Sequence, residues 1–293
     1  MNDFDTGNNY KLKNRADRVL SSISNLPTIP YVVFEVTKVI DNPSASAAQL
    51  AKIINKDQGL VTKILTVANS PLYGIPRRVS TIDFAIVILG FNHIKNIVIA
   101  LSMMDAMKSA SAKNFNQKQY WRHSLVVATA AKRLADDLGY PHSGEVFTAG
   151  LLHDLGIPII HKYFKKEYDN IVRFAEDNSV TYREAEVTEL GLSHEEIGKI
   201  LMERWNLPEN LSEVVEFHHN LNSSPQHKTI CALVHLADFM TQKLQIGDFF
   251  WDEGIELNPD IIKILNLGDM EYLDKLMVNY KSLFEEQINN LDF

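Results

Sequence analysis

A histidine and an aspartate lie side by side within a strongly apolar stretch of this sequence. His153 and Asp154 belong to TAGLLHDLGIPIIHKYF, residues 148–164. Burying a neutral polar group without a partner costs about 2–7 kcal/mol, and burying a charge costs more. The partner could be another side chain, or a metal ion that binds neutral imidazole and carboxylate. The pair alone does not distinguish between them.

Other histidines and one more aspartate occur in similar apolar contexts. A lone histidine there is more often a hydrogen-bonded core or capping residue than a metal ligand, and a lone aspartate is more often an ion-pair partner. The whole set favours a metal site, because side chains from facing helices can converge inside a bundle. The candidate metal ligands are His123, His153, Asp154, His194, His218, His219 and Asp238.

The first candidate ligands are expected on two helices. His123 is in step with the apolar residues of its segment, so it should point from the buried face of a helix. His153 and Asp154 are expected in the middle of the next helix, which Gly156 and Pro158 should end or kink.

The remaining candidates are expected at helix ends or in a helix interior. His194 follows a serine that suits an N-cap, and His218 and His219 end the segment SEVVEFHH. Asp238 lies inside the apolar helical segment ICALVHLADFM. One cysteine, Cys231, excludes a thiolate cluster, so a metal would bind to nitrogen and oxygen.

The sequence predicts an all-α protein. Apolar residues recur at steps of three and four, and no alternating strand pattern stands out. Three segments have the capping-box form, in which Ser or Thr precedes Glu or Gln by three residues. These segments begin at Ser46, Thr181 and Ser193.

A polar stretch of small residues, KSASAKNFNQ at 108–117, separates two strongly apolar helical regions and predicts a two-part helical bundle. We expect the last region to form a turn-rich connection and two more helices that cap the second part. The expected organisation is an N-terminal helical segment (1–25), a first helical subdomain (26–111), a metal-binding helical subdomain (112–247) and a C-terminal helical cap (248–293).

The composition limits the classes of partner. The net charge of -8 and the absence of a dense Lys/Arg run argue against direct binding of nucleic acid. The longest apolar run, Phe84 to Phe91, is far too short for a membrane span, and the first residues are polar. We therefore expect a cytoplasmic protein without a membrane partner.

Two resemblances extend these predictions. The contexts LLHDLG, LSHEEIG, EFHH and HLAD resemble the HD superfamily of metal-dependent phosphohydrolases, and its HD-GYP branch in particular. The runs LPTIPYVVFEVTKVI, AAQLAKIINKDQGLVTKILTVANSPLYG and STIDFAIVILGFNHIKNIVIALSM resemble the amino-terminal half of HDOD domains, which are HD-related output domains of bacterial signalling proteins. Together the resemblances cover residues 26–245.

The HD resemblance implies a site for two divalent transition-metal ions, and iron, manganese, nickel and zinc all suit these donors. HDOD domains commonly lack some of the ligands, whereas this chain keeps all seven. The resemblance implies that Asp154 bridges the two ions. It assigns His123, His153, Asp154 and Asp238 to one ion, and Asp154, His194, His218 and His219 to the other.

The sequence departs from the HD-GYP pattern in two places. Ile157 stands where HD-GYP proteins typically carry a lysine that meets substrate phosphate. Asn220 and the stretch LNSSP follow the paired histidines, in place of a glutamate and a Gly-Tyr-Pro loop. These departures make turnover of cyclic dinucleotides doubtful, because the residues that would position the substrate are missing.

Two functions of different classes remain open. The HDOD resemblance implies a signalling module whose helical surface, residues 26–110, binds a partner protein and whose metal is structural or acts as a sensor. The HD resemblance implies a phosphohydrolase that acts on a nucleotide or another phosphate ester. The first is preferred, because likeness of fold alone does not establish an activity.

Several other residues have plain interpretations. His235 lies three residues before Asp238, on the same helix face, so it should orient a ligand or be a satisfied core group. Arg77 and Arg78 are expected in a solvated loop. Three further histidines are expected at the surface: His142, His161 and His227.

Overall fold

The computed structural model describes residues 28–40, 42, 44–107, 115–249 and 251–290. This part of the chain is helical and contains no strand, which confirms the predicted all-α class. The predicted segment 1–25 and most of the polar stretch 108–117 lie outside the described residues. The α-helices are α2 (Tyr31–Ile40), α3 (Ala47–Ile54), α4 (Gln58–Ala68), α5 (Ile82–Leu89), α6 (Phe91–Ala106), α7 (Gln117–Asp137), α8 (Ser143–Leu152), α9 (Gly156–Tyr163), α10 (Lys165–Asn178), α11 (Tyr182–Leu190), α12 (His194–Arg204), α13 (Glu209–Phe217), α14 (Lys228–Lys243), α15 (Ile261–Ile264) and α16 (Met270–Asn290), with the 3-10 helices η2 (Pro71–Tyr73) and η3 (Leu221–Ser223).

All three predicted capping boxes are present, at the starts of α3, α11 and α12. In each box the N-cap hydroxyl accepts a hydrogen bond from the third helical N–H, and the Glu or Gln at that position accepts one from the N-cap N–H. The box at Ser193 fixes the start of α12 and therefore the position of the next residue, His194.

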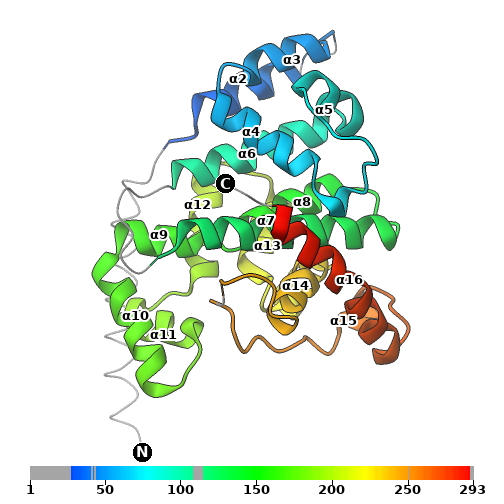
Figure 1. Ribbon diagram of the computed structural model, residues 1–293. Coiled ribbons are helices and arrows are strands. Elements are labelled where there is room, and N and C mark those ends of the chain that lie inside the picture. Colours follow the sequence, from blue (N-terminus) through cyan, green and yellow to red (C-terminus); the bar gives the residue numbers. More distant parts are fainter. Residues whose placement is uncertain (1–27, 41, 43, 108–114, 250, 291–293) are drawn as a thin grey trace, which may run out of the picture.

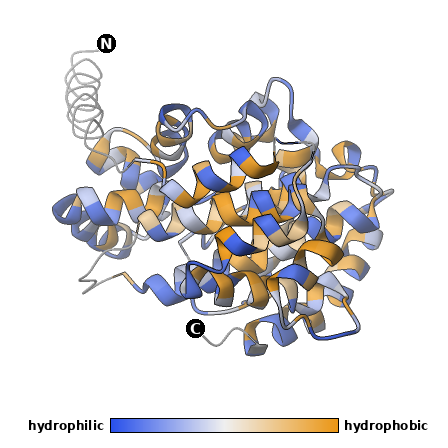
Figure 2. Cartoon of the chain, turned by 90° about the horizontal axis from the view of Figure 1, so that it is seen from above, coloured by the Kyte–Doolittle hydropathy of each residue, from blue (hydrophilic) through white to orange (hydrophobic). Residues whose placement is uncertain are grey.

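The helices form two groups that meet along α6, α7 and α8. Helices α2–α6 gather at one end of the molecule, and α7 crosses its middle (Figure 1). Helix α6 packs against α8, and α7 packs against α8 and α14. Seen from above, the central helices are largely hydrophobic and the outer ones carry many hydrophilic residues (Figure 2). Long-range packing therefore joins both groups around α7 and α8.

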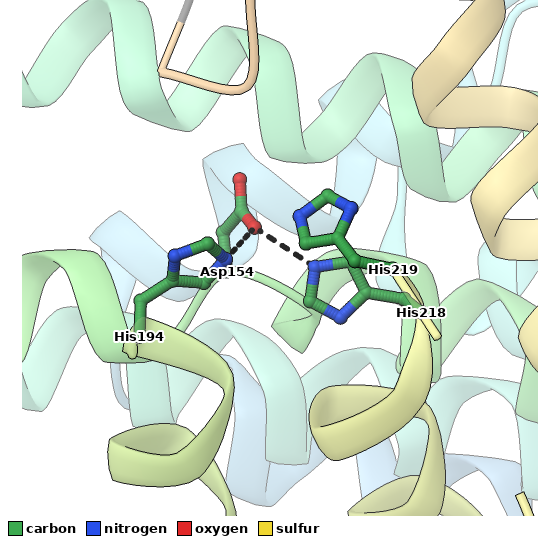
Figure 3. Close-up of side chains that lie close together, drawn as sticks. All are labelled: Asp154, His194, His218 and His219. Carbon is green, nitrogen blue, oxygen red and sulfur yellow. Dashed lines mark ion pairs between the residues drawn. The ribbon is translucent and has the colours of Figure 1, made fainter. Parts of the chain in front are cut away.

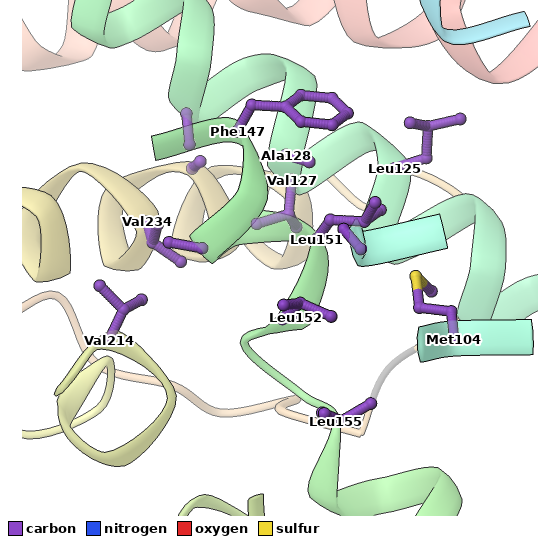
Figure 4. Close-up of a cluster of buried hydrophobic side chains, with 14 of the residues drawn as sticks. Met104, Leu125, Val127, Ala128, Phe147, Leu151, Leu152, Leu155, Val214 and Val234 are labelled. Atoms are coloured by element: carbon purple, nitrogen blue, oxygen red, sulfur yellow. The ribbon is translucent and has the colours of Figure 1, made fainter. Parts of the chain in front are cut away.

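Helices α7 and α8 cross very closely. A Cβ atom on Gly150 would lie 2.9 Å from the Cα of Ala128, so only small residues fit at this crossing. Around it lies an apolar core that includes Phe147, Leu151 and Val127, all fully buried (Figure 4). The close crossing brings the start of α7 and the end of α8 to the same interior region.

Helix α16 contacts both groups of helices, including η2 and α7. The hydroxyl of Ser70 hydrogen-bonds to the buried amide of Gln287, and Tyr280 donates a hydrogen bond of 2.8 Å to Asp137. The C-terminal helices therefore pack on the first part as well as on the second.

The prediction for His153 and Asp154 was wrong in one respect. They lie in the turn between α8, which ends at Leu152, and α9, rather than inside a helix. The helix breaks before Gly156, which is the first residue of α9. Pro158 lies in the first turn of α9, where its missing N–H costs no helical hydrogen bond.

No single helix within the described ranges is long and apolar enough to cross a membrane. Helices α5 and α6 have sufficient length and apolar character only as a pair, and the chain bends by 118° between them.

The first turn of α9 depends on a glycine. A Cβ atom on Gly156 would lie 1.9 Å from the carbonyl oxygen of His194, which is impossible without moving the backbone. We expect Gly156→Ala to lower the free energy of unfolding by about 1–3 kcal/mol or more, as overpacking does. Urea unfolding would measure this.

Gly59→Ala is a matched control, because Gly59 also lies in the first turn of a helix and the nearest atom to its added Cβ is a side-chain oxygen of Asp57 at 3.3 Å. Equal stability of the two variants would contradict the close contact between α9 and α12.

Candidate metal centre

The structure brings all seven predicted ligands into one buried cluster. They come from five places in the fold: the first half of α7, the α8–α9 turn, the start of α12, the end of α13 and the interior of α14. His219 is half-buried and the other six are buried. Their role as ligands stays a prediction, but their convergence is a property of the fold.

Asp154 lies at the centre of the cluster, and its two carboxylate oxygens face different histidines. Oδ2 lies 3.2 Å from Nε2 of His153 and 3.6 Å from Nε2 of His123. Oδ1 lies 3.5 Å from Nε2 of His218 and 3.6 Å from Nε2 of His194. Figure 3 shows the second pair of rings around this carboxylate. Asp154 thus connects two groups of imidazoles, one on each oxygen.

Asp238 and His219 complete the two groups. Oδ1 of Asp238 lies 3.3 Å from Nε2 of His123, and its carboxylate has an oxygen within 4.8 Å of donor nitrogens of His123 and His153. His219 lies next to His218, with ring centroids 4.0 Å apart, and joins the group around Oδ1 of Asp154. The candidate donor atoms thus form two close groups, with His123, His153 and Asp238 in one and Asp154, His194, His218 and His219 in the other.

Hydrogen bonds outside the cluster hold two of the rings in position. Nδ1 of His153 donates to the carbonyl oxygen of Gly150 at 2.7 Å. Nδ1 of His218 lies 3.1 Å from the carbonyl oxygens of Val214 and Val215. Because a carbonyl only accepts hydrogen bonds, Nδ1 carries a proton in each ring, and Nε2 faces the cluster. Metal-binding histidines commonly have this arrangement.

A buried glutamate that we did not predict holds His194. The carboxylate of Glu186, on α11, accepts hydrogen bonds from the backbone N–H of His194 at 2.7 Å and from its Nδ1 at 2.9 Å. It also accepts one from the indole Nε1 of Trp251 at 2.7 Å. Glu186 is fully buried, so these three donors take the place of water.

The connection between α14 and α15 covers the cluster. The ring centroid of Phe249 lies 5.3 Å from that of His123, and Trp251 stacks on Tyr182 at 4.5 Å. Asp252 is 7% exposed, and its Oδ1 lies 3.2 Å from Nε2 of His219. Asp252 is therefore a further carboxylate at the cluster, beyond the seven residues predicted from sequence.

Burial and charge oppose each other strongly in this region. Burial lowers the pKa of His123, but the carboxylates of Asp154 and Asp238 outweigh it and raise this pKa to about 10. Burial raises the pKa of Asp154, but His153 and the other nearby histidines lower it by more, so the pKa lies well below its usual value. Burial and the nearby charge of Asp154 raise the pKa of Asp252. The acidic groups therefore need positive charge close by.

The spacing of the donor atoms suits bonds to a shared metal ion better than hydrogen bonds between the atoms themselves. None of those facing the centre makes a hydrogen bond to a described residue, and the closest nitrogen–oxygen pairs are 3.2–3.6 Å apart. Two ligands bonded to one ion at about 2.0–2.2 Å, at angles of roughly 90–110°, lie about 3.0–3.5 Å apart. The atoms without hydrogen bonds are both oxygens of Asp154 and of Asp238, both ring nitrogens of His123, Nε2 of His153, His194, His218 and His219, and Oδ2 of Asp252.

His235 supports the backbone of the cluster rather than a ligand side chain. Its Nδ1 donates to the carbonyl oxygen of His218 at 2.8 Å, and its Nε2 accepts from the N–H of Asn258 at 3.1 Å. It is buried and hydrogen-bonded on both nitrogens. This fits the prediction of an outer, satisfied histidine.

The minor predictions had mixed outcomes. Arg77, Arg78 and His142 are exposed, as predicted. The surface prediction for His161 was wrong, because this residue is buried and stacks on Phe115 with ring centroids 4.7 Å apart. His227 is half-buried rather than fully exposed.

The helical architecture and the clustered histidines and aspartates define an all-helical class of domain with candidate metal ligands at its centre. The model of the HDOD domain matches residues 26–221. The chain therefore belongs to the HDOD domain family.

Three known proteins illustrate what this chain is similar to. An HDOD domain protein of unknown function from Geobacter sulfurreducens is 28% identical, with 94% of this chain and 97% of that chain covered and a TM-score of 0.73. A proposed metal-dependent phosphohydrolase from Shewanella amazonensis, 22% identical, shares the fold, with 96% and 100% covered and a TM-score of 0.63. An uncharacterized protein of Treponema pallidum is 25% identical over 235 residues, which are 80% of this chain and 45% of that protein. The chain thus spans less than half of the Treponema protein.

The role of Glu186 in holding His194 can be tested by stability. Glu186→Gln keeps one acceptor oxygen but turns an amide NH₂ group toward buried donors, so we expect the free energy of unfolding to fall by about 1–3 kcal/mol. Denaturant unfolding with chelator present would measure the loss without a metal contribution.

Glu189→Gln is the control, because Glu189 lies on the same helix and accepts one hydrogen bond of 3.3 Å from Asn170. That change should stay within about 0.5 kcal/mol. Similar losses for the two variants would contradict the special position of Glu186.

Proposed function

We propose that this chain is an HDOD-type output module of bacterial signal transduction, which binds a partner protein through its first helices and holds two divalent transition-metal ions in its second part. The observation that supports this most is the position of Asp154. Each of its oxygens faces two imidazole nitrogens, and the outer nitrogens of three of these four rings are engaged elsewhere.

Asp154 would contribute to the binding of both proposed ions. His123, His153 and Asp238 would complete one set of ligands, and His194, His218 and His219 the other. Iron, manganese, nickel and zinc all suit imidazole and carboxylate donors. When bound, such ions neutralise buried negative charge, and in hydrolases of this kind they activate water and polarise phosphate.

The cover over the cluster favours a structural or sensory role for the metal. Phe249 and Asp252 contact ligand rings from the α14–α15 connection, and both are buried. A cavity that reaches His123 holds only about 10 Å³, far less than the roughly 300–1,000 Å³ of a small-molecule site. Ile157, at the position of the HD-GYP lysine, is fully buried and offers no charge to a phosphate.

The first helices offer a surface suited to a protein partner. Tyr31 and Phe34 on α2 are 72% and 62% exposed, and their ring centroids lie 6.3 Å apart. Val87 on α5 is 70% exposed. Exposed apolar side chains that lie together, as Tyr31 and Phe34 do, are typical of protein interaction sites. This surface belongs to the region, residues 26–110, for which partner binding was predicted.

A metal-dependent phosphohydrolase is the second candidate function. The same ligand cluster favours it, because the donors that hold two ions in a structural site would also hold them in a catalytic one. For this function the α14–α15 connection would have to move away, so that a nucleotide or another phosphate ester could reach Asp154 and its neighbours.

The metal proposal is tested by two variants. We expect purified protein to hold about two transition-metal ions per chain, and Asp154→Asn to remove both, because it takes away the only negative charge shared by the two groups. His235→Ala should keep most of the metal and weaken affinity by about 10- to 100-fold, as loss of an outer partner does.

Element analysis and melting temperature, each with and without chelator, would report the difference. Metal at one hundred times its dissociation constant stabilises the fold by about 2.7 kcal/mol. Wild-type protein that neither carries nor takes up iron, manganese, nickel or zinc would refute the proposal.

The choice between the two functions rests on turnover. We expect metal-loaded protein to leave cyclic dinucleotides intact, because the phosphate-positioning residues are absent and the site is covered. Product formation from cyclic dinucleotides and a panel of nucleotides would be followed by chromatography. Turnover near the enzyme median of about 10 per second would favour the phosphohydrolase.

A further inference from the structure

A large cavity lies apart from the metal cluster, between the first helices and the second part. Its volume is about 810 Å³, within the range of roughly 300–1,000 Å³ typical of small-molecule sites. The α5–α6 corner, η2, α7, the start of α8 and the α12–α13 connection form its walls. None of the seven predicted metal ligands lines it.

Three α-helices begin at this cavity, namely α6, α8 and α13. Their N-cap residues, Gly90, His142 and Pro208, all line the cavity, and none of them provides a side-chain hydrogen bond to its helix. The first N–H groups of a helix lack partners within it, and the helix dipole makes this end partly positive. Convergence of three such ends favours an anion.

A buried histidine in the wall of the cavity has a ring nitrogen without a hydrogen-bond partner. His93 is 8% exposed, and its Nε2 lies 2.6 Å from the hydroxyl of Tyr73. Its Nδ1 has no hydrogen bond and faces the first turn of α8, where a Cβ atom on Gly144 would lie only 2.9 Å away.

The charge state of His93 determines which hydrogen-bonding group in the wall lacks a partner. Burial and the nearby Lys132 lower the pKa of His93 to about 3, so the ring is neutral near pH 7. If Tyr73 donates to Nε2, Nδ1 carries the ring proton and lacks an acceptor. If Nε2 donates to Tyr73 instead, the hydroxyl proton of Tyr73 lacks an acceptor. Either arrangement leaves one buried donor in the wall without an acceptor.

The charged side chains of the wall also favour an anion. Lys95 and Lys132 both line the cavity, and Lys132 is held by Asp136 at 2.6 Å. The carboxylate of Glu145 also lines it and accepts a hydrogen bond of 2.6 Å from Asn210. Lys95, Lys132 and three helix N-termini therefore bring positive charge to the wall, while the two carboxylates near it, Asp136 and Glu145, each already have a partner.

We propose that this cavity binds a small phosphate ester with an apolar or aromatic part, of about the size of a nucleoside monophosphate. The phosphate lies at the helix N-termini near Lys132. The apolar part packs on wall residues such as Phe91, Ile99 and Leu211. Inorganic phosphate alone would leave most of the volume unfilled. None of the residues that line this cavity is a candidate metal ligand, so the proposal does not require bound metal.

Calorimetric titration of the full chain with AMP, phenyl phosphate, inorganic phosphate and adenosine tests the proposal. AMP or phenyl phosphate should bind. Inorganic phosphate, which lacks the apolar part, and adenosine, which lacks the phosphate, should each bind at least about tenfold more weakly than AMP. Rising salt should weaken binding of AMP.

A matched pair of lysine variants locates the site. Lys132 pairs with Asp136 and Lys275 pairs with Glu271, in each case four residues apart on one helix. Lys132→Ala should weaken AMP binding about tenfold. Lys275→Ala should leave AMP binding unchanged, because Lys275 does not line the cavity. Melting curves would confirm that both variants fold.

Two outcomes would overturn the proposal. The first is that neither AMP nor phenyl phosphate binds to wild-type protein at millimolar concentration. The second is that Lys132→Ala binds as the wild type does, which would place any phosphate binding elsewhere, including at the metal centre. Neither outcome depends on whether the protein carries metal.

Discussion

The carboxylate of Asp154 is the constraint on which the second part of the molecule depends. It is fully buried and makes no hydrogen bond to a described residue, yet the pKa of Asp154 is held low by the surrounding histidines, with His153 the largest contributor after burial itself. An uncompensated charge in a protein interior is strongly destabilising. The five segments that supply the cluster must therefore keep their registry, because a shift in any of them removes compensating groups from this charge.

The packing around the cluster follows from that requirement. Gly150 lets α8 approach α7 closely, and Gly156 lets α9 meet the backbone at His194. Without these close approaches the histidines would be too far from Asp154. Glu186 and Trp251 then fix the His194 ring from the outside. The same contacts that satisfy buried polar groups also close the centre to solvent, which links stability to the proposed metal function.

Sequence alone predicted the helices and the seven residues of the cluster, because periodicity and capping boxes are local signals and the HD resemblance orders the ligands along the chain. It missed Glu186 and Asp252, whose neighbours in sequence are ordinary for a surface helix and a turn. Glu186 is buried against Trp251 and Asp252 against His219, and both contacts join distant parts of the sequence that no spacing rule connects. A buried aromatic beside an acid, as in Trp251–Asp252, was the available signal.

Helices α8 and α13 connect the two candidate sites of this molecule. Each begins at the large cavity, and His153 and His218 directly follow their last residues. At about 1.5 Å per residue, α8 and α13, of 10 and 9 residues, are roughly 15 and 14 Å long. Packed helices move as rigid units, typically by about 1–2 Å in regulatory transitions. An anion that draws on both N-termini would thus act on the same two helices that position the histidines around Asp154.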